Sequence, residues 1–217
     1  MIEQLRATGL PRPSPRQLIA ALRPAPGERI LELRPGAGHH AHRVARHLGP
    51  TGRLDLVDIP EHMLDEAIHY LEARPTPDRA WVVPTVADPR TLPFADHTFT
   101  SAYVIAALST FPDPGRVLDE LHRVLQPTGR LVIADHRRTH WLPPDTARRL
   151  ARRHGFSLIT SQGTGRYVHL LSPLRAFSER TPALEGADTT RSSVLSFTET
   201  GAELEYVRPL LDGRTPG

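Results

Sequence analysis

Arg29-Ile-Leu-Glu-Leu-Arg-Pro-Gly-Ala-Gly38 decides the fold, because an apolar strand runs directly into a glycine turn there. A second apolar strand, residues 53–58, ends at the acidic residue Asp58. Glycines let the backbone approach a ligand closely at the start of a helix, and an acid at the end of the second strand can bind a ribose diol. Together the two features predict a site for a nucleotide-type cofactor.

The glycine turn by itself leaves the cofactor undecided. Gly36, Gly38 and Ala41 also satisfy the dinucleotide fingerprint G-x-G-x-x-G/A, which is typical of nicotinamide enzymes. A nicotinamide oxidoreductase therefore stays among the hypotheses until residues farther along the chain are considered.

The composition favours one folded α/β domain with a tail. The chain has 217 residues, of which 39% are hydrophobic, and this is enough for one sizeable core. We divide it into an N-terminal arm and helix (1–25), a folded domain (26–172) and a C-terminal tail (173–217). The absence of cysteine excludes disulfides and thiolate chemistry.

Neither a membrane nor a nucleic acid is expected as a partner. The N-terminal residues lack the apolar stretch of a signal peptide, and no apolar run is long enough to span a bilayer, so we expect a cytoplasmic protein. All 27 basic residues are arginine, yet the formal net charge is only +3. The arginine pairs at 137–138, 148–149 and 152–153 have no aromatic residues interleaved for base stacking, which favours a solvated helix face.

Apolar periodicity and turn residues indicate alternating strands and helices. Pro84 lies inside the third strand and predicts a bulge or an edge position there. The last two strands, around Gly163-Thr-Gly165, are expected to form an antiparallel hairpin at the sheet edge. Helices are predicted to begin near residues 14, 38, 61, 114 and 145, and strands to span residues 29–33, 53–58, 80–87, 98–106, 130–134, 156–161 and 167–171.

Three later segments narrow the choice of cofactor. They are Val86-Ala-Asp-Pro-Arg-Thr-Leu-Pro-Phe-Ala-Asp-His-Thr-Phe99, Phe111-Pro-Asp-Pro114 and Leu121-His-Arg-Val-Leu-Gln-Pro-Thr-Gly-Arg-Leu-Val-Ile-Ala-Asp135. In this order they resemble the class I S-adenosylmethionine-dependent methyltransferases, in particular the ubiquinone and menaquinone biosynthesis group, also called methyltransferase type 11. The resemblance covers residues 26–172 and makes nicotinamide binding a minor alternative.

The resemblance implies both a fold and a cofactor site. The fold would be a Rossmann-like three-layer α/β sandwich with a seven-stranded, mostly parallel sheet whose last strand is antiparallel. S-adenosyl-L-methionine would lie across the carboxyl ends of the first four strands, where the switch-point rule for parallel sheets also places a ligand. By position, the resemblance implies that Glu32, Gly36 and Gly38 shape the cradle for the methionine part, whose ammonium group would meet the Val104 backbone. Asp58 would bind the ribose hydroxyls. Ile59 would border the adenine, and Asp88 would accept a hydrogen bond from the adenine amino group.

The chain departs from the family pattern at three places. Arg34 stands where the first glycine of the E/D-x-G-x-G-x-G turn is expected, and a side chain there can crowd the cofactor. Thr100 replaces a common acid just before the fourth strand, and Ser109-Thr110 replace a frequent histidine pair near the substrate. These departures bear on catalysis rather than on the fold.

The candidate catalytic residues follow from the chemistry that the resemblance implies. Methyl transfer from a sulfonium is an in-line displacement, so positioning supplies much of the acceleration. A hydroxyl acceptor would also need a base on the loops after the fourth or fifth strand. His136 is the first candidate, followed by His140 and Tyr103.

No metal site is predicted. Asp135, His136 and His140 could bind a metal if their segment were helical, but Pro143-Pro144 indicates a loop.

Two functional hypotheses lead, and a nicotinamide oxidoreductase remains as a third. The first is a methyltransferase acting on a small-molecule acceptor, whose pocket is closed by the N-terminal helix, residues 135–144, the tail or the second subunit of a homodimer. The second is a methyltransferase-like protein that binds the cofactor or a partner without methylating, as a cyclase, binding module or regulatory subunit. Arg34 and the missing histidine pair motivate the second hypothesis.

Overall fold

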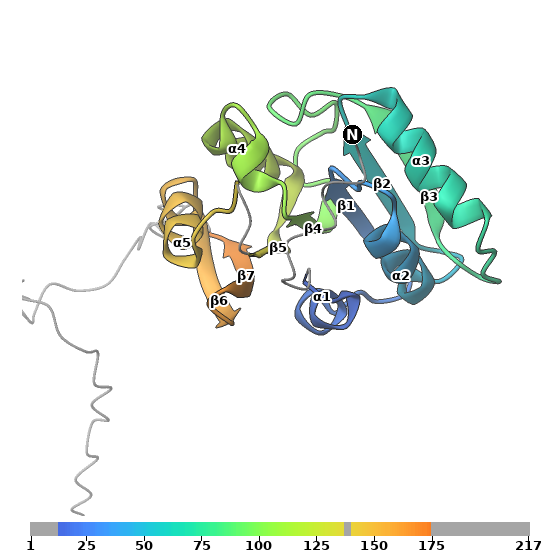
Figure 1. Cartoon of the computed structure of the whole chain (residues 1–217), viewed down its shortest axis with the longest axis horizontal. Helices are drawn as coiled ribbons and strands as arrows, with labels where there is room; N and C mark the ends of the chain where they lie inside the picture. The colour runs from blue at the N-terminus through green and yellow to red at the C-terminus, as the bar shows by residue number, and fades with distance from the viewer. Residues whose placement is uncertain (1–12, 137–139, 175–217) are drawn as a thin grey trace, which may run out of the picture. The chain divides into compact units, whose positions relative to one another are not determined.

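A computed structural model of the chain describes residues 13–136 and 140–174 (Figure 1). Within these residues a seven-stranded sheet forms the centre of the fold, and helices cover both of its faces. In chain order the strands are β1 (Arg29–Leu33), β2 (Arg53–Asp58), β3 (Trp81–Val86), β4 (Phe99–Ile105), β5 (Leu125–His136), β6 (Phe156–Gln162) and β7 (Arg166–Pro173).

The sheet has the topology that the sequence predicted. Its strand order is β3-β2-β1-β4-β5-β7-β6, and the pairs from β3 through β5 are all parallel. β7 runs antiparallel to both of its neighbours, β5 and β6. The mostly parallel sheet with an antiparallel last strand is therefore confirmed, as is the hairpin at the sheet edge.

The helices divide into two groups, one on each face of the sheet (Figure 1). Successive residues of a strand point to opposite faces, so Ile30 packs with the first three helices and Leu31 packs with the last two. One face carries α1 (Pro15–Leu22), α2 (His39–Leu48) and α3 (Glu61–Glu72), and the other carries the 3-10 turn η2 (Leu108–Thr110), α4 (Pro114–Val124) and α5 (Pro144–Arg153).

The helix starts follow from local sequence. Ser14 and Gln17 form a capping box at the start of α1, and Pro15 occupies its first position, as predicted. The Asp113 side chain accepts the backbone N–H of Arg116 at 3.0 Å and so caps α4. Side chains thus cap the N-termini of both helices.

Two details of the strands refine the prediction. Pro84 lies on the edge strand β3 and is paired with Leu56 of β2. The β2–β3 pairing continues on both sides of Pro84 without a register shift. An edge strand tolerates proline because one side of it has no partner to accept an N–H. β5 begins at Leu125 rather than at residue 130, because Leu125 already pairs with Phe99 and a shift in register absorbs the predicted turn at 126–129.

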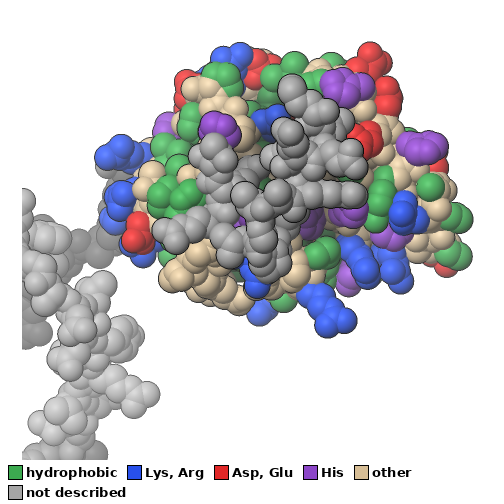
Figure 2. Space-filling model, viewed as in Figure 1, with side chains coloured by type: hydrophobic (Ala, Val, Ile, Leu, Met, Phe, Trp, Pro, Cys, Tyr) green, Lys and Arg blue, Asp and Glu red, His purple; other side chains and the backbone are tan. Residues whose placement is uncertain are grey.

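Several further expectations concern the surface and the ends of the chain. In the described part of the chain, no helix is long and apolar enough to cross a membrane. On the face shown in Figure 2, arginine side chains are spread over several elements instead of forming one basic strip. Residues 1–12 of the predicted arm and helix (1–25) and residues 175–217 of the predicted tail (173–217) lie outside the described residues, so the domain boundaries stay predictions.

Candidate cofactor site

The predicted cofactor residues gather at the carboxyl end of the parallel strands. The glycine turn follows β1, Asp58 is the last residue of β2, and Asp88 comes shortly after β3. Val104 lies near the end of β4, opposite Leu33. β1 lies between β2 and β4, and a parallel α/β sheet binds ligands where its connections diverge in this way. The topology thus brings these residues to the place where a ligand would lie.

The two predicted glycines differ in their surroundings. Gly38 precedes α2 with φ of 79°, and a Cβ there would lie 2.8 Å from the Ala67 carbonyl oxygen on α3. Gly36 also has a positive φ of 56°, but a Cβ there would meet nothing within 4 Å among the described residues. Gly38 is therefore needed for close packing, whereas Gly36 borders open space beside the N-terminus of α2.

Glu32 is a buried acid beneath this turn. The Tyr103 hydroxyl donates a 2.7 Å hydrogen bond to Glu32 Oε2, and the two residues are paired across β1 and β4. Burial raises the pKa of Glu32 to about 8, although the Tyr103 bond acts in the opposite direction. Glu32 is therefore mostly uncharged at neutral pH and forms a polar but neutral wall.

Tyr103 itself is fully buried. Burial, and next the neighbouring Glu32, raise the pKa of its hydroxyl well above the usual range. The hydroxyl is directed at Glu32 and holds that side chain in place. The predicted role of Tyr103 as a base stays a prediction.

Asp58 is the second acid of the site, at the end of β2. Its Oδ1 accepts the backbone N–H of Ile59 at 2.9 Å, while the Ile59 side chain is 53% exposed. Burial raises the pKa of Asp58, and the Ile59 N–H and the Arg34 guanidinium oppose this rise. Within the described residues, Oδ2 has no hydrogen-bond donor and is available to a ligand hydroxyl.

Arg34 reaches across the carboxyl ends of two strands. Its backbone has φ of 55°, in the left-handed region that favours glycine. The guanidinium donates to the Thr110 hydroxyl after β4, and its Nε lies 3.9 Å from Asp58 Oδ1 at the end of β2. Its Cζ also lies 5.6 Å from the centre of the Phe111 ring. Arg34 thus connects the two sides of the site.

Asp88, the third acid, is already engaged by a neighbour. Arg90 Nη2 lies 2.6 Å from Asp88 Oδ2, and the Arg90 backbone N–H donates to Oδ1 at 2.9 Å. These bonds lower the pKa of Asp88. A ligand amino group would therefore share this carboxylate with Arg90.

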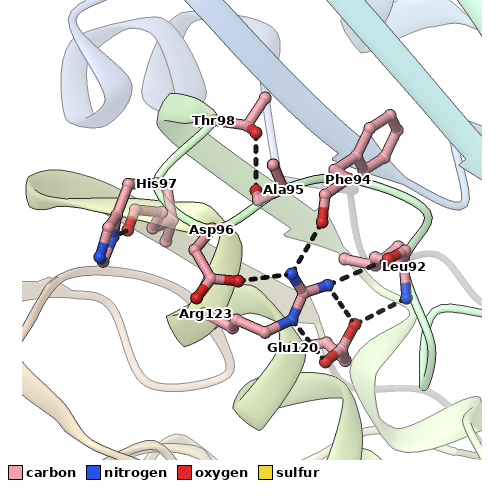
Figure 3. Close-up of polar contacts among 9 residues, drawn as sticks. Leu92, Phe94, Ala95, Asp96, His97, Thr98, Glu120 and Arg123 are labelled. Atoms are coloured by element: carbon pink, nitrogen blue, oxygen red, sulfur yellow. Dashed lines mark hydrogen bonds and ion pairs between the residues drawn. The ribbon is translucent and has the colours of Figure 1, made fainter.

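Arg123 on α4 fixes the loop that follows Asp88 (Figure 3). Its guanidinium donates to the carbonyls of Leu92 and Phe94 at 3.0 and 2.7 Å and to Asp96 at 2.8 Å. Glu120 holds the same guanidinium at 2.8 Å and accepts the Leu92 N–H at 2.7 Å. The β3–β4 loop is thereby attached to α4 by charge-assisted hydrogen bonds.

The two candidate histidines lie near the end of β5 in different environments. His136 is buried, and its Nδ1 lies 4.0 Å from Asp135 Oδ1. His140 is exposed, and its carbonyl accepts a hydrogen bond from the Ser109 hydroxyl. This bond joins the loop after β4 to the segment after β5. Residues 137–139 lie outside the described residues, and both catalytic roles stay predictions.

Sequence reasoning missed three contributors to the site. Thr110 was noted only as a departure from the family pattern, and Phe111 only as part of a motif, yet both contact Arg34. Arg90 was not singled out, although an arginine two residues after an aspartate can fold back onto it. That spacing is the signal that could have identified the Asp88–Arg90 pair.

In the described residues no group of three metal-binding side chains occurs.

A Rossmann-like sheet with this glycine turn, an acid at the end of β2 and an antiparallel last strand defines a class I S-adenosylmethionine-dependent methyltransferase fold. The chain belongs to the ubiE/COQ5 methyltransferase family, whose model matches residues 15–150. The methyltransferase resemblance predicted from the sequence is therefore confirmed.

Curated relatives agree with this membership. The chain is 38% identical over 103 residues to a 2-phytyl-1,4-naphtoquinone methyltransferase of Nostoc sp., a match covering 47% of this chain and 44% of the relative. It is 31% identical over 141 residues to the ubiquinone/menaquinone biosynthesis C-methyltransferase UbiE of Paracoccus denitrificans, covering 60% of this chain and 53% of the relative. The chain thus spans about half the length of the curated relatives it matches.

Solved structures share the fold at low sequence identity. A SAM-dependent methyltransferase from Aquifex aeolicus matches with a TM-score of 0.62 and 19% identity, covering 73% of this chain and 89% of that one. The [4+2]-cyclase SpnF matches with a TM-score of 0.64 and 16% identity, covering 75% and 80%. At such identities the likeness concerns the fold alone.

The family implies S-adenosylmethionine as the cofactor, and the residues of the site fit it. Open space lies beside Gly36, next to the N-terminal end of α2. Asp58 Oδ2 can accept a ribose hydroxyl, and Ile59 presents an exposed apolar side chain directly after it. Polar groups for a ribose, an apolar side chain for a base and room at the turn are the features that such a nucleoside requires.

Proposed function

We propose that this protein transfers a methyl group from S-adenosylmethionine to a small aromatic acceptor of the quinol type. The observation that carries the proposal is Asp58 at the end of β2, whose Oδ2 has no hydrogen-bond donor among the described residues, in a chain of the ubiE/COQ5 family. Gly36 in the turn after the neighbouring strand β1 adds room, since a Cβ there would meet no described residue within 4 Å. Two relatives support the acceptor class, since one is a 2-phytyl-1,4-naphtoquinone methyltransferase and the other a ubiquinone/menaquinone biosynthesis C-methyltransferase.

The chain's own residues would perform binding and proton transfer. When bound, the cofactor supplies a methyl group on a sulfonium, which is a good leaving group. Asp58 would hold the ribose, and the neutral Glu32, fixed by Tyr103, would line the wall without adding charge. His136, or the exposed His140, would take the acceptor's proton as the methyl group is transferred. Asp135 would fix the backbone around His136, because its carboxylate accepts the backbone N–H groups of His136 and Leu142 at 2.8 and 3.2 Å.

Alternatives of other classes receive less support. The curated relatives are methyltransferases, so a non-methylating cyclase, binding module or regulatory subunit is not favoured. A nicotinamide oxidoreductase is likewise not favoured by the family membership. A homodimer remains a prediction of the sequence.

Calorimetry with S-adenosylhomocysteine tests the proposed function directly. We expect the wild type to bind, and Asp58→Ala to weaken binding by about tenfold or more because a buried ribose acceptor is lost. Asp65→Ala is the matched control, because Asp65 is an exposed acid on α3. Equal affinities of the two variants would contradict the site, and absence of binding by the wild type would contradict the cofactor.

A further inference from the structure

Arg34 is the residue of the site that the family fold does not require. Its left-handed backbone, with φ of 55°, is costly for any residue that has a Cβ. The Arg34 backbone N–H donates to the Val57 carbonyl at 2.8 Å, which attaches this residue to β2 directly after the last β1–β2 pair. An outlier that tertiary structure maintains in this way points to a role for the side chain.

The Arg34 guanidinium lies between the ribose acid and the loop after β4. It contacts Asp58 on one side and Thr110 and Phe111 on the other. A guanidinium has five N–H donors, and among the described residues the Arg34 side chain donates a hydrogen bond to Thr110 alone, since Asp58 at 3.9 Å is beyond hydrogen-bond distance. Donors therefore remain for an anion that enters the site.

Among the described residues, the acid next to the Arg34 guanidinium is Asp58, whose charge it offsets. Asp88 is offset by Arg90, and burial keeps Glu32 mostly neutral by raising its pKa to about 8. In the cofactor only C4′ and C5′ stand between the ribose diol and the sulfur, so the sulfonium of a cofactor whose ribose is bound by Asp58 would lie near that carboxylate and the guanidinium beside it. Two neighbouring positive charges repel, and a negatively charged acceptor would offset this repulsion.

We propose that Arg34 is a specificity-determining residue, which selects an aromatic acceptor carrying a negative oxygen, as a phenolate or carboxylate. The inference rests on the proposed function and names the charge state of its substrate. The guanidinium binds the acceptor's oxygen through its remaining N–H donors. Without acceptor, it disfavours the positively charged sulfonium relative to the neutral thioether left after methyl transfer.

Binding measurements separate the charge of Arg34 from its size. The dissociation constants of S-adenosylmethionine and S-adenosylhomocysteine are measured by calorimetry for the wild type, Arg34→Met and Arg34→Lys. We expect the ratio of the first constant to the second to fall by about tenfold in Arg34→Met and to be retained in Arg34→Lys, because only the first variant loses the charge. Arg149→Met is the matched control, since Arg149 is exposed on α5.

The acceptor is tested with a charged and an uncharged probe of the same shape. On the protein loaded with S-adenosylhomocysteine, 2-naphthoate should bind about fivefold or more tightly than 2-naphthamide, and Arg34→Met should abolish the preference. The role of Arg34 alone is overturned if Arg34→Met leaves the ratio of the two nucleoside dissociation constants unchanged, or if 2-naphthoate does not bind to the loaded wild type. If the wild type binds neither nucleoside, the proposed function is overturned together with the role of Arg34.

Discussion

The central strand and the edge strand of the site treat their acidic residues in opposite ways. Glu32 on β1 is buried, and burial raises its pKa to about 8. Asp88 follows the edge strand β3, its side chain is 32% exposed, and hydrogen bonds from Arg90 lower its pKa. Asp58 on β2 is an intermediate case: burial raises its pKa, and the Ile59 N–H and the Arg34 guanidinium oppose that rise. Position in the sheet therefore sets the charge that each part of a ligand meets.

The two arginines repeat this contrast. Arg90 binds an acid two residues away, so the pair belongs to one short loop. Arg34 pairs with Asp58 across two strands and keeps an unfavourable backbone conformation in doing so. A local ion pair at the surface contributes little and is easily replaced, whereas a contact between strands depends on the whole fold.

Glu32→Gln should have the largest effect. The folded-state pKa of Glu32, about 8, lies above its ordinary value of 4.5. The stability that protonated Glu32 contributes is therefore fully present below pH 4.5 and is lost as the pH rises toward 8. The wild type should therefore lose stability relative to Glu32→Gln by a few kcal/mol between about pH 5 and about pH 8. Urea unfolding at the two pH values measures the difference.

The edge acid provides the control with the opposite sign. The pKa of Asp88 is lowered, so any stability it contributes is present above its ordinary pKa and is lost as pH falls. Asp88→Asn should leave the loss of stability toward pH 8 unchanged. Parallel pH profiles of wild type and Glu32→Gln would show that the central acid is not buried in its neutral form.

The two glycines of the central turn should separate folding from binding. Gly38→Ala places a methyl group 2.8 Å from the Ala67 carbonyl at a positive φ, so we expect a loss of about 3 kcal/mol of unfolding free energy. Gly36→Ala has room, and its positive φ costs only about 1 kcal/mol. Denaturation measures both. The reverse order of stabilities would mean that the turn packs differently.

Amide substitution of the two aspartates compares the middle and edge strands as ligand sites. Asp58→Asn should weaken S-adenosylhomocysteine binding by about tenfold, because the buried carboxylate is held with one oxygen available. Asp88→Asn should weaken it by about twofold at most, because Arg90 already occupies that exposed carboxylate. Thermal shift as a function of ligand concentration measures both affinities. Equal effects at the two positions would remove the distinction between them.

The sequence predicted the elements of the fold well because their signals are local. The helix starts predicted near residues 14 and 38 agree with α1 and α2, which begin at Pro15 and His39, so tertiary structure did not override these local signals. The pairing of Leu125 with Phe99, which lengthened β5, was not predictable, because it depends on the register between two strands. Pro84 predicted either a bulge or an edge-like irregularity; β3 is an edge strand without a bulge, and the sequence alone did not decide between the two.

The charge states of the site could not be predicted from the sequence. Asp58 and Asp88 were assigned by position in a motif, and nothing local distinguishes the buried acid from the exposed one. The Tyr103 hydroxyl reaches Glu32 only because β1 and β4 are neighbours in the sheet. Arg34 was recognised as a departure from the glycine pattern, but its contacts with Thr110 and Phe111 come from a loop after β4.

The smallest expected effect isolates the backbone of Arg34. Arg34→Gly and Arg34→Ala both remove the guanidinium and its contacts with Asp58 and Thr110, so the difference between them reports the left-handed backbone alone. Glycine adopts a φ of 55° without steric cost, so Arg34→Gly should be more stable than Arg34→Ala by about 1 kcal/mol. The same pair at Arg90, which has no such backbone, should show glycine equal to or less stable than alanine, because glycine loses more entropy on folding. Urea unfolding of the four variants measures both differences. If Arg34→Ala is the more stable of its pair, the turn relaxes on losing the guanidinium, and the side chain holds the backbone in its strained form.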